Sequence, residues 1–84
     1  MSIKSVALGN EYDTELALRI RQTLKALKAK RVGAWWGLGG SQEILSATYK
    51  IKGQKINFES ETYLGVTLTG AQEAVDLFLQ AFNR

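Results

Sequence analysis

The spacing of the apolar residues changes twice along this chain, and these changes constrain the fold more than any other feature. Near the N-terminus the apolar residues recur every three or four positions, which predicts a helix over residues 14–30 with one buried face. Between residues 32 and 68 they alternate instead, which is typical of strands. The helical spacing then returns over residues 71–82. The two helical stripes consist of Leu16, Ile20, Leu24 and Leu27, and of Ala71, Val75, Phe78 and Phe82.

Turn-forming residues divide the alternating region into strands. We expect strands over 32–38 and 45–51 and a final strand over 63–68 in which Leu64 points inward. Gly53-Gln54 fits the two-residue loop of a type II′ hairpin, which places Ile51 opposite Ile56 and Tyr49 opposite Phe58. A weaker alternation over 2–8 predicts a short first strand.

Polar residues precede both predicted helices. Asn10, Asp13 and Thr14 can each cap the first helix, and Thr69 followed by Gln72 has the spacing of a capping box for the second. The order is therefore a weak strand, a helix, three or four antiparallel strands and a helix. We interpret residues 1–84 as one α+β domain, a two-layer sandwich with both helices on one face of the sheet and water on the other.

Missing residue types exclude several kinds of chemistry. The 84 residues include no Cys and no His, so disulfides, zinc fingers, iron–sulfur clusters and His-dependent nucleophiles cannot form. No pair of carboxylates has a spacing that defines an acid–base site. We therefore expect no enzyme activity, no metal and no cofactor.

The chain contains no run of about 20 apolar residues that would span a membrane, and its N-terminus does not have the pattern of a signal peptide. We expect a cytoplasmic protein that does not bind membranes.

The two adjacent tryptophans must point to opposite faces of their strand. Trp36 follows the core pattern, so Trp35 is expected on the outer face, near Lys50. Trp35 could anchor a protein partner or stack on a base. Alternatively, it could lie across Gly33 and Gly37 and fill the space left by their missing side chains.

Two leucines lie off the helical stripes and add to the apolar surface. Leu18 is opposite the first stripe and Leu77 lies well off the second. Together with Trp35 and Lys50 they suggest a small interaction module that binds a protein partner through its open sheet face, with a second copy of itself as one candidate.

Bases in the first helix support an alternative function, nucleic-acid binding. Arg21, Lys25 and Lys28 form a stripe, Arg31 follows, and no acid occurs between Glu15 and Glu43. Such a row can follow a phosphate backbone, but it can also solvate a helix face and complement the helix dipole. The glycine-rich segment 37–41 is interpreted as a hairpin turn, since no lysine follows at phosphate-loop spacing.

Overall fold

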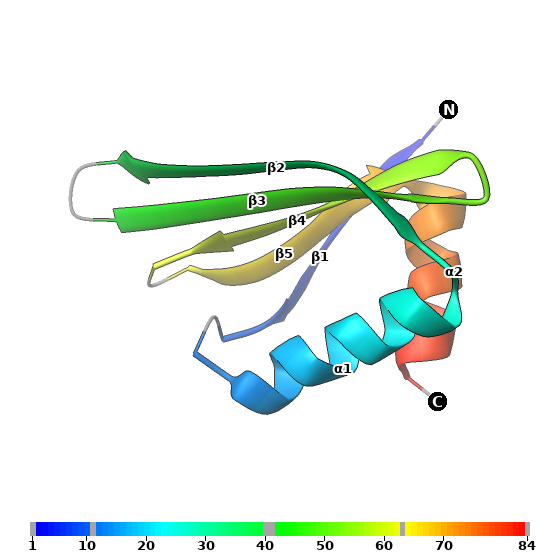
Figure 1. The fold of residues 1–84 in the computed structure, drawn as a ribbon, viewed down its shortest axis with the longest axis horizontal. Coiled ribbons are helices and arrows are strands. Elements are labelled where there is room, and N and C mark those ends of the chain that lie inside the picture. Colours follow the sequence, from blue (N-terminus) through cyan, green and yellow to red (C-terminus); the bar gives the residue numbers. More distant parts are fainter. Residues whose placement is uncertain (1, 11, 40–41, 63, 84) are drawn as a thin grey trace.

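The computed structural model describes residues 2–10, 12–39, 42–62 and 64–83. Within these residues the chain forms two helices and a five-stranded antiparallel sheet with strand order β1-β5-β4-β3-β2 (Figure 1). The elements are β1 (Ile3–Gly9), α1 (Thr14–Ala26), β2 (Lys30–Gly39), β3 (Gln42–Ile51), β4 (Gln54–Glu61), β5 (Gly65–Ala71) and α2 (Gln72–Phe82). The α+β class is confirmed. A sheet of three or four strands was expected, and this number was too low, because in the described ranges β1 joins the four strands between the helices as a fifth.

The weakly alternating segment at the start of the chain is a sheet strand. β1 pairs antiparallel with β5, with Val6 opposite Leu68 and Ser5 opposite Thr69. The hydroxyls of Ser5 and Thr69 form a hydrogen bond of 3.0 Å. β1 therefore forms one edge of the sheet, and β2 forms the other.

The two helices begin in different ways. Asp13 caps α1, and its Oδ1 accepts a hydrogen bond from the amide of Leu16 at 3.0 Å. The capping box expected at Thr69 was wrong, because Thr69 lies within β5 and the N-cap of α2 is Ala71, whose side chain makes no capping bond. Instead, the next amide along the chain donates to the carbonyl of Ser2 at 2.9 Å. Because β5 pairs with β1 as far as Ala71, the segment from Thr69 to Ala71 is part of a strand and does not cap the helix.

The first helix ends at Ala26, four residues before its predicted end. The amide of Ala29 donates to the carbonyl of Leu24 at 2.9 Å, and that of Lys28 donates to the carbonyl of Lys25 at 3.1 Å. These two bonds form a Schellman motif. Lys28 occupies the left-handed position of this motif, with φ of 57°, where glycine is usual. The chain therefore leaves the helix here although the basic, helix-favouring sequence continues.

The turn of the β3–β4 hairpin is Lys52-Gly53, and not Gly53-Gln54 as expected. Both turn residues have positive φ, of 47° and 82°, as in a type I′ turn. Ile51 therefore lies opposite Gln54 and Tyr49 opposite Ile56, which shifts the register by two residues from the predicted one. A shift of two preserves the face of every side chain, so the predicted faces of β3 and β4 were right although their partners were wrong.

The last strand begins later than predicted. β5 starts at Gly65, and Tyr63 lies outside the described residues. Leu64, which was expected to point inward, precedes the strand and is 69% exposed. Leu68 is fully buried, as the alternation predicted.

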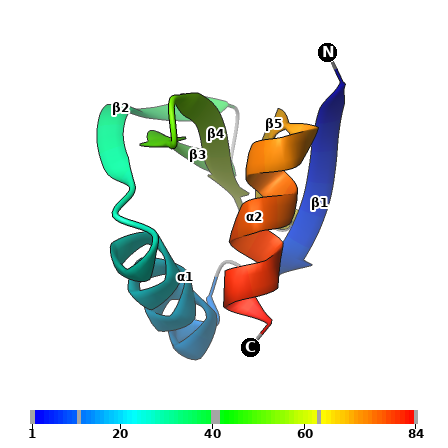
Figure 2. The same cartoon turned by 90° about the vertical axis from the view of Figure 1, so that its right-hand side faces the viewer.

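The core lies between α2 and the end of the sheet formed by β3, β4 and β5. Phe78 of α2 packs edge-on against Phe58 of β4, with ring centroids 5.2 Å apart, and stacks on Phe82 at 5.4 Å. Both helices lie on the same side of the sheet, as predicted (Figure 2). We call this side the inner face and the opposite side the outer face. The buried apolar residues are Leu16, Leu24, Ile51, Ile56, Phe58, Leu68, Ala74, Val75, Phe78 and Phe82.

Candidate functional site

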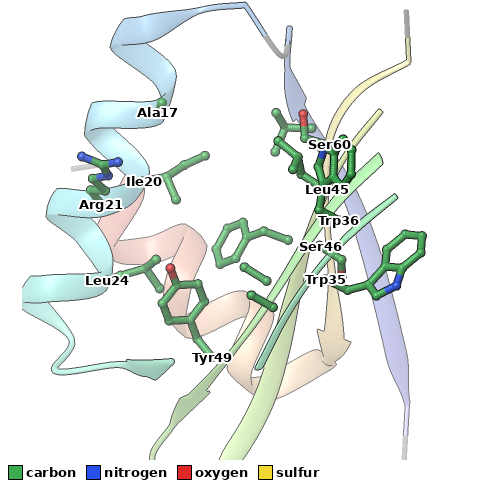
Figure 3. Close-up of a pocket in the computed structure, with 14 residues that line it drawn as sticks. Ala17, Ile20, Arg21, Leu24, Trp35, Trp36, Leu45, Ser46, Tyr49 and Ser60 are labelled. Atoms are coloured by element: carbon green, nitrogen blue, oxygen red, sulfur yellow. The ribbon is translucent and has the colours of Figure 1, made fainter. Parts of the chain in front are cut away.

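An apolar groove runs along the inner face, between α1 and the strands β2 to β4. Its volume is about 580 Å³. Ile20 and Leu24 point from α1 toward the sheet, and Tyr49 points from the sheet toward α1 (Figure 3). The side chains that characterise this apolar groove are Ile20, Leu24, Trp36, Leu45, Tyr49 and Phe58.

The groove stays open because α1 packs on α2 and does not cover the far part of β2 and β3. The guanidinium of Arg19 lies 4.2 Å from the centre of the Phe82 ring, and its Nη2 donates to the Phe82 carbonyl at 3.0 Å. These contacts hold α1 beside the C-terminal half of α2. The β2–β3 hairpin extends past both helices at its far end (Figure 1).

Trp36 was expected in the core, but it is 56% exposed. It lies on the inner face opposite Leu45, beyond the part of the sheet that α2 covers. Leu38, which lies two residues along β2 on the same face as Trp36, is 68% exposed, and Val32 is exposed as well. Alternation identified the face of Trp36 and Leu38, but the length of the hairpin relative to the helices leaves that face uncovered.

One of the two edges of the sheet is formed by β2. From Val32 to Gly39 this strand carries no charged residue, and Lys30 and Arg31 occupy its start. The register shifts between Arg31 and Gly33, and the strand is regular from there to its end. An edge strand exposes unpaired backbone N–H and C=O groups, and proteins usually protect such edges with charge, proline or short length. β2 has none of these protections over its last eight residues.

Trp35 lies on the outer face, as predicted, and is 59% exposed. It points away from α1 (Figure 3). Its ring also covers Gly37, because a β-carbon at position 37 would lie 2.6 Å from Cζ2 of Trp35. No atom lies within 4 Å of the corresponding position at Gly33. Both interpretations of Trp35 are therefore right in part: the ring rests on one of the two glycines and keeps more than half of its surface exposed.

The outer face carries a row of three lysines that the sequence analysis missed. Lys30 of β2 lies directly opposite Lys50 of β3, which lies directly opposite Lys55 of β4. All three side chains are exposed. The predicted register placed Lys50 opposite Asn57, so the two-residue shift caused by the Lys52-Gly53 turn is what aligns Lys50 with Lys55. A turn assigned to that dipeptide would have revealed this pair, whereas the place of Lys30 depends on the pairing of β2 with β3.

Next to these lysines the outer face is polar and hydrogen-bonded. Ser46 Oγ and Thr48 Oγ1 both donate to Asn57 Oδ1, at 2.9 and 3.0 Å. The far end of the face carries Glu59 and Glu61 on one strand. A hydrogen bond to Glu59, desolvation and the charge of Glu59 together raise the pKa of the Glu61 carboxyl above its ordinary value of 4.5.

The other predicted site residues are dispersed. Arg21 and Lys25 are exposed on α1, Lys28 lies beyond the helix, and Arg31 lies opposite Tyr49 on β3. The structure therefore does not form the continuous stripe that was predicted along one helix.

The two stray leucines differ from each other. Leu18 is 54% exposed, as expected. Leu77 is partly buried and packs against the core, so its assignment as free surface was wrong.

Among the described residues, no helix has the length and apolar character needed to cross a membrane. Comparison of this chain with protein-family models, with curated proteins and with solved structures found no match.

Proposed function

We propose that this protein is a non-catalytic interaction module that pairs with a second copy of itself through the edge of β2 and the apolar groove beside it. The observation that carries this proposal is the free edge of β2, uncharged over eight residues and flanked by the exposed side chains of Trp36 and Leu38. Such an edge is a template for another strand.

The exposed surface area of the chain is large enough to include an interface with a second copy. The chain exposes 5818 Å². A compact monomer of 9.3 kDa exposes about 5,000 Å² according to the scaling of surface with mass. The excess of about 800 Å² equals the area that each partner buries in a protein–protein interface of standard size.

Charge favours a second copy in antiparallel orientation. The bases of β2 lie at its start, so antiparallel pairing places Lys30 and Arg31 of one copy beside the uncharged end of the other. Pairing of this kind has two-fold symmetry and buries the same surface on both copies. Trp36 lies near the middle of β2, so the two copies of this side chain approach each other on the inner face and extend the apolar groove.

Sedimentation velocity over a range of concentrations tests the proposal. We expect the wild type to form a dimer and Trp36→Lys to be a monomer, because charge on an edge strand opposes pairing. Leu18→Lys is the matched control, since Leu18 is equally exposed but lies on α1 away from β2, and this variant should remain dimeric.

Amide hydrogen exchange distinguishes edge pairing from packing of the groove alone. In the dimer, the β2 amides that point away from β3 should become protected as the concentration rises. A wild type that stays monomeric at millimolar concentration would refute the proposal, as would a dimer that Leu18→Lys dissociates and Trp36→Lys does not.

A further inference from the structure

The row of lysines on the outer face places three cations on adjacent strands. Directly opposite residues on neighbouring strands have β-carbons about 5 Å apart. In the described ranges the observed ion pair is between Lys4 and Asp76, at 2.6 Å, and no carboxylate pairs with Lys30, Lys50 or Lys55. Like charges in directly opposite positions destabilise a sheet. The row therefore offers a site for an anion whose binding would relieve this repulsion.

The groups beside the row identify the kind of anion. Asn57 Oδ1 already accepts two hydrogen bonds, so its amide nitrogen is the group available to donate to a ligand. Thr48 lies opposite Asn57, and Ser46 lies two residues from Thr48 on β3. Trp35 of β2 lies directly opposite Ser46, and its ring is exposed. An antiparallel sheet that presents cations, an amide and an aromatic ring matches the way proteins bind single-stranded nucleic acid: cations contact phosphates and aromatic rings stack on bases.

The acidic groups of the outer face restrict where a phosphate backbone can lie on it. Glu59 lies in the same cross-strand row as Ser46 and Trp35, and Glu61 lies two residues further from the lysines along β4. Their charge repels phosphate, so a bound strand would keep its backbone at the lysine end and its bases toward Trp35. Lys50 and Ser46 are four residues apart on β3, or about 13 Å at the rise of an antiparallel strand.

We propose that the outer face binds single-stranded nucleic acid, with Lys30, Lys50 and Lys55 contacting phosphates and Trp35 stacking on a base. Each contact is sequence-independent, so the surface should bind oligo(dT) and oligo(rU) alike. This proposal does not depend on self-association, because pairing of β2 edges leaves the outer face open. It also differs from the prediction based on α1, since its cations lie on three strands of the sheet.

Fluorescence anisotropy of end-labelled oligo(dT) and oligo(rU) of about 20 nucleotides tests the proposal. We expect Lys30→Gln/Lys50→Gln/Lys55→Gln to weaken binding at least tenfold at about 50 mM salt and to reduce the slope of log K against log salt by about 2. Its circular dichroism and melting temperature should match or exceed those of the wild type, because the repulsion is gone.

A control variant removes the same number of charges from the region around α1. We expect Arg21→Gln/Lys25→Gln/Lys28→Asn to bind within about twofold of the wild type, because these three residues contact no phosphate in the proposed complex. Its salt slope should also be unchanged, since each lost phosphate contact would lower the slope by about 0.7. Loss of binding in this variant, with the lysine variant unaffected, would overturn the proposal in favour of α1.

The two tryptophans provide a second readout. Oligonucleotide should quench the fluorescence of Trp36→Phe, in which Trp35 is the remaining tryptophan, and leave that of Trp35→Phe unchanged. Vesicles of phosphatidylserine and phosphatidylcholine form the last arm. Binding to vesicles without binding to either oligonucleotide, or no binding to oligonucleotide at low salt, would refute the assignment to nucleic acid.

Discussion

Whether glycine or alanine gives the more stable protein at position 28 depends on one backbone angle. With φ of 57°, Lys28 has the left-handed conformation at the end of α1. A residue with a β-carbon pays about 1–2 kcal/mol for this conformation. Glycine avoids that strain but loses about 0.5–1 kcal/mol through the greater freedom of the unfolded chain. The difference favours Lys28→Gly over Lys28→Ala by about 0.5–1 kcal/mol, and both variants lose the same ammonium.

Arg21 provides the matched comparison within the helix. It is exposed like Lys28 but lies in the interior of α1, where glycine is about 1 kcal/mol less favourable than alanine. Arg21→Gly should therefore be less stable than Arg21→Ala, the opposite order from position 28. For a domain of this size, a difference of 1 kcal/mol corresponds to a shift of about 4–8 °C in melting temperature.

Thermal unfolding of the four variants, monitored by circular dichroism, measures both differences under identical conditions. The protein concentration must be constant, because self-association would make the melting temperature depend on it. If Lys28→Gly were no more stable than Lys28→Ala, then Lys28 would not occupy the left-handed position, and α1 would continue to residue 30 as its sequence predicts.

Three further predictions concern the core and the outer face. Phe78→Ala should destabilise the fold by about 3–5 kcal/mol, since Phe78 is fully buried, and urea unfolding measures the loss. Gly70→Ala should destabilise it by about 1–3 kcal/mol in the same assay, because a β-carbon there would lie 2.7 Å from the carbonyl oxygen of Lys55; a neutral effect would show that β4 and β5 are less closely packed. Glu59→Gln should lower the pKa of Glu61 toward its ordinary value of 4.5, which NMR titration of the side-chain carboxyl detects. Because the folded wild type holds this proton more tightly than the unfolded chain, its stability should fall as pH rises from 4.5 through the folded-state pKa of Glu61, and this fall should be smaller in the variant.

Periodicity alone predicted the faces of the sheet correctly. Lys50, Thr48 and Ser46 share the outer face with Asn57 and Trp35, as alternation indicated. This holds even though the hairpin turn was misassigned by one residue, because the resulting shift of two residues returns every side chain to the same face. A strand's face depends on local geometry, which its own sequence specifies.

Composition and periodicity were enough to predict the α+β class, the two helices and the absence of disulfide and His-dependent chemistry. The features on which both proposals rest depend on contacts between elements. The turn at Lys52-Gly53 aligned Lys50 with Lys55, and the pairing of β2 with β3 placed Lys30 beside them. The packing of α1 on α2 left Trp36 uncovered on the face where alternation had placed it. The physical reason is the same in both cases: the repeat of a strand specifies which way a side chain points, whereas its neighbours across the sheet and above it depend on contacts between segments far apart in the chain.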